Sequence, residues 1–161
     1  LGKIAIIKTQ NYKHAKMSGV SETDARKLAF APHLNIGVFS LMKNSPCWEN
    51  WQNNLKKVLL KGRIFGSEGL AINMSVYLDN IPTEFLPISH NWITSHLLPI
   101  YDEKSKTFKE PNIPNNDIGI IHLAAGIWKN GIDMRVDKNI RVNIKSLEGK
   151  TLEKSLRHLI K

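Results

Sequence analysis

Apolar residues recur at helical spacing in two successive segments near the middle of the chain. The first follows Ser45, a suitable cap, with Pro46 at the first helical position and Gly62 just past the end. Its apolar stripe comprises Trp48, Trp51, Leu55, Val58 and Leu59. The second helix follows Ser67, with Glu68 in its first turn, and its apolar stripe comprises Leu70, Ala71, Met74, Tyr77 and Leu78. The pattern predicts two amphipathic helices in succession.

Four other segments carry strand patterns. Residues 34–42 and 118–123 are apolar on both faces, which is typical of buried strands. Residues 3–8 form a shorter strand-like run, and residues 139–145 alternate between apolar and polar side chains. We therefore predict two buried strands, a strand at the start of the chain, and a half-exposed strand near its end.

Two short helices and one long loop complete the pattern. Helices are predicted near residues 22–28 and over residues 152–160, where leucines and an isoleucine recur at helical spacing. Residues 87–116 contain four prolines, and a loop this long in a compact domain is usually functional or mobile. The order of elements indicates an α/β or α+β protein with a mixed sheet. No repeat or linker divides the chain, so we expect one domain over residues 1–161.

Composition narrows the class of protein. The 161 residues suffice for one domain with a core. No apolar run approaches the roughly 20 residues that a membrane span needs, and the first residues lack the pattern of a signal peptide. Cys47 is the single cysteine, which excludes an internal disulfide framework and a cysteine zinc cluster. We expect a cytoplasmic protein.

The charge raises the question of an anionic partner. Lys and Arg number 23 against 14 Asp and Glu, giving a net charge of +9. Such a balance suits a polyanion, a membrane surface or a phosphorylated ligand. However, the basic residues are scattered and do not interleave with aromatics, so solvated faces explain them equally well.

Four ordered segments resemble motifs of one enzyme family. Residues 35–41 with 44–46 are similar to an F-N-x-G-V-F-x-L…S-P-x-W stretch, and residues 68–73 are similar to a D-Q-x-A-L-N helix start. Leu86-Pro87 with Asn91-Trp92 is similar to L-P-x-x-x-N-W, and residues 120–129 are similar to a terminal H-x-x-G-x-x-K. Together they resemble the GT-A glycosyltransferases of the glycogenin and bacterial galactosyltransferase-like group, over roughly residues 30–130.

The resemblance implies a fold and a missing part. It implies the C-terminal portion of a GT-A nucleotide-diphospho-sugar transferase, an α/β fold with a mixed sheet flanked by helices. The family's first half carries the nucleotide-binding strands and an Asp-x-Asp motif for a divalent metal, and no Asp-x-Asp occurs in this sequence. The chain also starts at Leu1 in a strand-like run. We therefore expect a C-terminal fragment of a larger catalytic domain, with Mn²⁺ or Mg²⁺ bound partly by residues outside it.

The resemblance assigns roles in the helical half of the match. Glu68 would be the catalytic carboxylate near the anomeric carbon, and Asn35 and Gly37 would lie near the donor sugar. Two departures weaken the carry-over: Glu68 is longer than the family's aspartate, and Gly69 stands where the family has glutamine. The structural alternatives are an ordinary acid at a helix start and a glycine that eases packing.

Four more residues receive roles from the other two motifs. His122 would be a metal ligand, and Lys129 would bind the diphosphate as a point cation. Asn91 and Trp92 would contact the acceptor or a sugar ring. The alternatives are a satisfied histidine at a sheet edge, a surface lysine, and a tryptophan that anchors its loop in the core.

The function that the resemblance implies is a metal-dependent glycosyltransferase. It would move a sugar from a nucleotide-diphosphate donor to a glycan or lipid-linked acceptor, and its basic charge suits peripheral contact with a membrane. One competing interpretation is a non-catalytic scaffold relative, which the departure at Gly69 favours. Another is a basic nucleic-acid-binding module, the less favoured partner class, because only net charge supports it.

Overall fold

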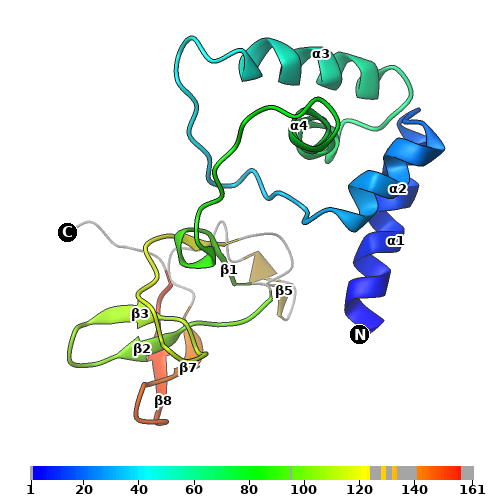
Figure 1. Ribbon diagram of the computed structural model, residues 1–161. Coiled ribbons are helices and arrows are strands. Elements are labelled where there is room, and N and C mark those ends of the chain that lie inside the picture. The colour runs from blue at the N-terminus through cyan, green and yellow to red at the C-terminus, as the bar shows by residue number, and fades with distance from the viewer. Residues whose placement is uncertain (1, 95, 124–127, 130–131, 134–140, 157–161) are drawn as a thin grey trace. The chain divides into compact units, whose positions relative to one another are not determined.

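The computed structural model describes residues 2–94, 96–123, 128–129, 132–133 and 141–156 (Figure 1). Within these residues the chain is mixed α/β, with α-helices first and short two-stranded sheets afterwards, which confirms the α/β class. The chain divides into two compact units, the N-terminal unit Leu1–Glu84 and the C-terminal unit Phe85–Lys161. The single domain over residues 1–161 stays a prediction.

The N-terminal unit opens with a helix where a strand was predicted. Helix α1 spans Gly2–Met17, so the predicted strand over residues 3–8 is wrong. A short apolar run cannot be told from a helix by its pattern alone, and here no Gly or Pro interrupts residues 3–18. The helix ends before Gly19, whose φ of 82° is a left-handed conformation that favours glycine.

Helix α2 spans Glu22–Phe30 and confirms the short helix predicted near residues 22–28. The Ser21 hydroxyl caps it by accepting a hydrogen bond from the Asp24 backbone N–H at 3.1 Å. Pro32 follows, and the residue before a proline is biased toward extended backbone, which ends the helix at Ala31.

Helices α3 (Cys47–Leu59) and α4 (Ser67–Tyr77) confirm the two amphipathic helices. They pack on each other (Figure 1). The residues that α3 buries differ from those predicted. Its buried residues are Cys47, Asn54 and Val58, whereas Trp48 and Leu59 remain 43% and 42% exposed. Of the predicted apolar stripe of α3, Val58 faces the core, whereas Trp48 and Leu59 do not. A polar cluster around Asn54 occupies part of the buried face.

That polar cluster centres on the Asn54 side chain, which is 1% exposed. Its amide Nδ2 donates to Asp79 Oδ2 at 2.7 Å and to Ser75 Oγ at 3.1 Å. Asn50 Nδ2 also donates to Asp79 Oδ2, at 2.9 Å. Because buried polar groups are costly when unpaired, these bonds fix how α3 lies on α4.

The apolar core of the N-terminal unit joins all four helices. Its buried members are small or aliphatic: Ala15, Val20, Ala25, Leu28, Val58 and Leu70. Half-buried side chains pack around them from α1 and α4: Tyr12, Met74, Tyr77 and Leu78. The helices are therefore held by burial of apolar area rather than by propensity alone.

The segment over residues 34–42 is an irregular loop, so the predicted buried strand there is wrong. The Asn73 side chain on α4 serves the backbone of Leu34 instead of a neighbouring strand. Its Oδ1 accepts from the Leu34 N–H at 3.0 Å, and its Nδ2 donates to the Leu34 carbonyl at 3.2 Å. A strand forms only where its backbone pairs with another strand. The two bonds from Asn73 occupy the N–H and the carbonyl that Leu34 would need for such pairing.

The C-terminal unit begins with a parallel strand pair. A 3₁₀ turn, η1 (Ile88–His90), leads into β1 (Trp92–Ile93), which pairs in parallel with β4 (Ile121–His122). The strand predicted over residues 118–123 is thus present but shorter. It is also half-buried rather than fully buried, and Ile120 is 42% exposed.

Antiparallel hairpins form the rest of the described C-terminal unit. Strand β2 (Ile100–Asp102) pairs with β3 (Thr107–Lys109), and β5 (Trp128–Lys129) pairs with β6 (Ile132–Asp133). The loop predicted over residues 87–116 therefore contains strands. Strand β7 (Val142–Lys145) confirms the later part of the half-exposed strand predicted over residues 139–145, because Ile144 is 3% exposed between exposed neighbours. Residues 139 and 140 lie outside the described part.

The end of the described chain is a strand, β8 (Thr151–Lys154), which pairs with β7. The predicted helix over residues 152–160 is wrong at its start, and residues 157–160 lie outside the described part. Gly149, with a φ of 85°, turns the chain back so that Leu152 lies opposite Ile144. Pairing with β7 therefore makes residues 151–154 a strand, although their leucine spacing is that of a helix.

Candidate functional site

Asn91 and His122, two predicted site residues from different motifs, lie together in the C-terminal unit. Asn91 directly precedes β1 and His122 ends β4, with Ile93 and His122 in register. Asn91 Oδ1 and His122 Nδ1 are 2.9 Å apart and share a hydrogen bond. Asn91 lies two residues before Ile93, whose register partner is His122, so the two polar side chains project from the same face of the pair.

This bond determines the proton arrangement on the His122 ring. An amide oxygen can only accept, so the Nδ1 atom of His122 carries the proton. In the neutral ring, the lone pair is then on Nε2. Nε2 is therefore the atom that can take up a proton or coordinate a cation, with Asn91 setting the orientation of the ring.

Thr94 is a supporting residue that the sequence interpretation missed. Its backbone N–H and its Oγ1 both donate to the His122 carbonyl, each at 3.2 Å. The residue is 4% exposed, so these bonds are shielded from water. The signal was weak: a threonine two residues beyond Trp92, in a segment that we took for a loop.

Trp92 has the position of an anchor. It is 6% exposed, and its Nε1–H donates to the Leu97 carbonyl at 2.8 Å. A buried indole whose polar atom is satisfied internally holds a loop in place. The geometry favours this alternative over stacking on a sugar ring.

In the N-terminal unit, Glu68 lies in the first turn of α4 with its side chain exposed. The backbone carbonyl of Glu68 accepts a hydrogen bond from Trp51 Nε1 at 3.0 Å. The side-chain carboxylate takes no part in this bond. The residue before the helix, Gly66, has a φ of 84°, so this turn favours glycine. The helix N-terminus favours a negative charge at Glu68.

His14 lies near Glu68, and no signal in the sequence selected it. Burial and the nearby Arg63 lower the pKa of His14, while Glu68 acts in the opposite direction. A side chain at Gly66 would approach the His14 ring to 3.2 Å. Within the described residues, His14 Nε2 is buried without a hydrogen-bond partner. Only tertiary packing places this histidine beside the first turn of α4.

Asn35 and Gly37 form a local turn in the same unit. Asn35 Oδ1 accepts a hydrogen bond from the Gly37 N–H at 2.8 Å, and both residues are exposed. The neighbouring Leu34 is bound by Asn73, the last residue of the second motif. The structure thus brings the first two motif segments together. An exposed turn also excludes the alternative in which Gly37 eases the packing of a buried strand.

The fourth motif is only partly described. Lys129 lies in β5, where its backbone pairs with that of Ile132. Gly126 and the Lys129 side chain lie outside the described residues. The role of Lys129 at a diphosphate therefore stays a prediction.

The described residues contain no group of three or more His, Cys, Asp or Glu side chains placed to hold a metal ion. Beside His122 they provide an amide and a hydroxyl, from Asn91 and Thr94. Mn²⁺ and Mg²⁺ prefer carboxylate oxygens, which this edge does not offer. These residues do not fit such a metal by themselves, although His122 Nε2 suits one ligand position.

Comparison with known proteins adds no relative: no family model, curated protein or solved structure matches the chain. None of the helices that the structure describes is long and apolar enough to cross a membrane. The chemistry of the site therefore rests on the residues and contacts given above.

Proposed function

We propose that the chain is the C-terminal portion of a GT-A glycosyltransferase, which transfers a sugar from a nucleotide-diphosphate donor to a glycan or lipid-linked acceptor. The observation that carries the proposal is the hydrogen bond between Asn91 and His122. It joins the third and fourth motif segments at side chains that the resemblance had already selected. The Asn73–Leu34 bonds, which join the first two segments, support it independently.

His122 and Asn91 act as a pair in this proposal. Asn91 holds the ring through Nδ1, and Nε2 of His122 binds an electrophilic or acidic group of the donor complex. Lys129 neutralises charge on the departing diphosphate. His122 Nε2 would supply one ligand to a divalent metal, whose carboxylate ligands would come from outside the described residues.

Glu68 supplies the carboxylate of the proposed chemistry. As positive charge develops at the anomeric carbon, an exposed carboxylate stabilises it or acts as base or nucleophile. Asn35 and Gly37 offer an amide and an unhindered backbone to the donor sugar. In the C-terminal unit, Asn91 contacts the acceptor.

Nucleotide-dependent stabilisation tests the proposal. We expect uridine diphosphate to raise the melting temperature of the protein in its full natural length, with Mn²⁺ increasing the shift. His122→Ala should abolish most of the shift, and Asn91→Ala should reduce it, since the ring then loses its orientation. His96→Ala is the matched control, because His96 is an exposed histidine of the same unit. If no nucleoside diphosphate changes the melting temperature, the proposal fails.

A non-catalytic relative is a second candidate, and one observation bears on it. Gly69 stands where the family has glutamine, and a Cβ built there meets no other atom within 4 Å. Packing therefore does not require glycine at this position. Gly69→Gln should fit and should increase sugar transfer or donor hydrolysis if the chain is a weakened enzyme. If neither the natural protein nor this variant turns over a nucleotide sugar while both bind it, the non-catalytic candidate is correct.

A further inference from the structure

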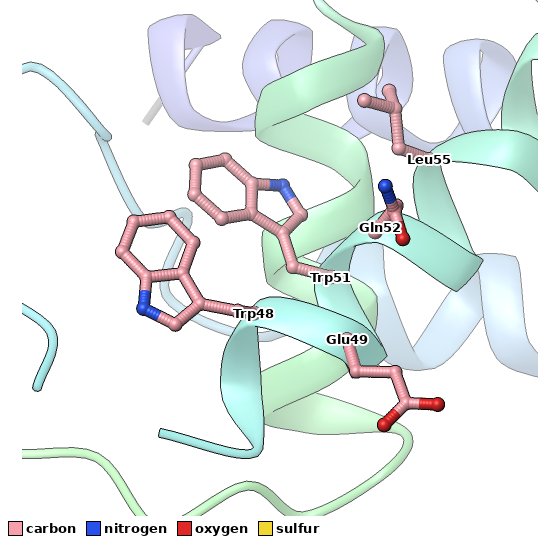
Figure 2. A pocket seen from close by; sticks show the side chains of 5 residues that line it. All are labelled: Trp48, Glu49, Trp51, Gln52 and Leu55. Atoms are coloured by element: carbon pink, nitrogen blue, oxygen red, sulfur yellow. The ribbon is translucent and has the colours of Figure 1, made fainter. Parts of the chain in front are cut away.

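The outward side of α3 carries an aromatic surface that the proposed chemistry does not use. Trp48, Glu49, Trp51, Gln52 and Leu55 line an open hollow of about 500 Å³. Figure 2 shows the two indoles side by side and broadside to the viewer, with Glu49 and Gln52 beside them. This volume lies within the roughly 300–1,000 Å³ of small-molecule sites. We call these five residues the aromatic platform.

The rings of the platform have a fixed arrangement. The centroids of Trp48 and Trp51 are 6.0 Å apart, with an angle of 21° between the ring planes. Phe39, from the preceding loop, stands edge-on to both, with ring centroids 6.4 Å from Trp48 and 5.5 Å from Trp51. The two nearly parallel indoles are stacked on each other and braced by a third ring, so that their ring surfaces are held in a fixed arrangement.

Hydrogen bonds hold both indoles in place. Trp48 Nε1 donates to the Met42 carbonyl and Trp51 Nε1 donates to the Glu68 carbonyl, each at 3.0 Å. The polar atoms of the rings therefore face the protein's own backbone, and what remains for a ligand is ring surface. Trp48 is 43% exposed and Phe39 is 50% exposed. A rigid surface of this kind binds without losing side-chain entropy.

Polar side chains on the same helix face identify the kind of ligand. Glu49 and Gln52 are exposed and line the same hollow as the indoles. Among the described residues neither side chain has a hydrogen-bond partner. An apolar protein segment covering the hollow would remove the Glu49 carboxylate from water without compensation. A sugar instead offers C–H groups to the rings and hydroxyl groups to the carboxylate and the amide.

We infer that the aromatic platform is a carbohydrate-binding subsite for a neutral glycan. A pyranose ring stacks on the exposed indole of Trp48, which Trp51 supports from beside it, while Glu49 and Gln52 bind its hydroxyl groups. The carboxylate of Glu49 disfavours acidic sugars, because two like charges would meet at short range. That the bound glycan is the acceptor rests on the proposed glycosyltransferase function, whereas the binding itself does not.

Oligosaccharide binding tests the subsite. Neutral probes, maltohexaose and cellohexaose, are titrated into the protein and followed by calorimetry and saturation-transfer NMR, with hexagalacturonate as the acidic counterpart. We expect a neutral hexasaccharide to bind with a dissociation constant in the micromolar to millimolar range, and the acidic one to bind at least tenfold more weakly. Trp48→Ala should weaken neutral binding at least tenfold, and Glu49→Gln should narrow the preference against hexagalacturonate.

Two further variants separate stacking from folding. Trp48→Phe keeps a ring but loses the bond to Met42, so it should retain most of the binding that Trp48→Ala loses. Leu60→Ala is the control, because Leu60 is an 84% exposed apolar residue just past the same helix. Retained binding in Trp48→Ala, or no binding of either neutral probe, overturns the inference. Self-association that Trp48→Ala abolishes, without sugar binding, would assign the surface to a second copy of the chain.

The outcome is separable from that of the nucleotide test. Sugar binding without any effect of uridine diphosphate would support the subsite and reject the transferase. A nucleotide effect without sugar binding would keep the transferase and reject the subsite.

Discussion

The two units of the chain are stabilised in different ways. In the N-terminal unit, helices bury a continuous apolar cluster, and the polar contacts at Asn54 fit between α3 and α4. In the C-terminal unit, the described strands have two to four residues, and turns and side-chain bonds to the backbone connect them. The comparison teaches that local patterns predict helices α2, α3 and α4, whereas the backbone at Leu34 and the short paired strands depend on contacts distant in sequence.

The largest effect should come from a matched pair of core truncations. Leu70→Ala in α4 and Ile144→Ala in β7 each remove a side chain that is at most 6% exposed. Each should lower the free energy of unfolding of its own unit by about 2–4 kcal/mol, because the cavity closes only partly. Hydrogen exchange of backbone amides measures this unit by unit, and Leu60→Ala should change little.

The same experiment examines the single-domain prediction. If Leu70→Ala accelerates exchange equally in β7 and β8, the two units unfold together. The chain would then behave as a single domain in unfolding.

A smaller effect is expected from the polar cluster of the N-terminal unit. Asn54→Leu keeps the volume but removes the amide that donates to the buried Ser75 Oγ and to Asp79 Oδ2, and Asp79 then retains only the bond from Asn50. Buried groups left unsatisfied cost about 1–3 kcal/mol, measured as the free energy of unfolding in urea. Asn53→Leu places the same side chain on the adjacent exposed position and should be nearly neutral. Equal effects of both substitutions would show that the cluster adds nothing to stability.

Acid should separate the two units, with a smaller effect again. Burial and Arg63 lower the pKa of His14, and burial of the imidazole followed by the charge of His14 lowers that of His33. For both histidines the pKa in the folded state lies below the ordinary 6.5 of the unfolded chain. Between each folded-state pKa and 6.5, the unfolded chain therefore binds more protons than the folded one. The stability of the N-terminal unit is therefore full above pH 6.5 and falls as the pH drops below it.

The C-terminal unit should respond only at lower pH. The Lys104 backbone N–H lowers the pKa of Asp102, and the Lys109 side chain lowers that of Asp117, both from an ordinary value of 3.8. Their stabilising bonds are retained above pH 3.8 and lost as the carboxylates take up protons below it. Amide exchange at pH 7, 5 and 3 measures the order. Simultaneous loosening of both units near pH 5 would contradict it.

The smallest effect belongs to the surface ion pair of α2. Arg26 and Glu22 are 2.6 Å apart, one helical turn from each other, with side chains 67% and 56% exposed. Arg26→Ala should cost about 0.3–0.5 kcal/mol, and 0.5 M salt should remove the difference from the natural protein. A loss of more than about 1 kcal/mol would show that the arginine stem also packs on the helix.

Helix signals were the part of the fold that sequence could predict. Ser45, Pro46 and Gly62 mark the region of α3, and the start of α4 after Ser67 was also predicted. Residues 3–8 were mistaken because six residues cannot distinguish a strand from the first turns of α1. Residues 34–42 were mistaken because their apolar pattern does not show that the Asn73 side chain, 39 positions beyond Leu34, binds that backbone.

The candidate site was predictable as residue types but not as an arrangement. Asn91 and His122 were selected from their motifs, and only the pairing of β1 with β4 shows that they touch. Thr94 and His14 gave no comparable signal, because their importance comes from partners far away in sequence. Trp92 was selected for its chemistry, yet its burial gives it an anchoring position.

The Asn73–Leu34 contact has a kinetic consequence. The two hydrogen bonds require that the Asn73 side chain already project from α4 before the backbone at Leu34 can dock. Bringing Leu34 and Asn73 together across 39 positions also costs more chain entropy than forming a local helical turn. We therefore expect the Leu34 backbone to dock only after α4 has formed, and during synthesis only after the ribosome has delivered Asn73.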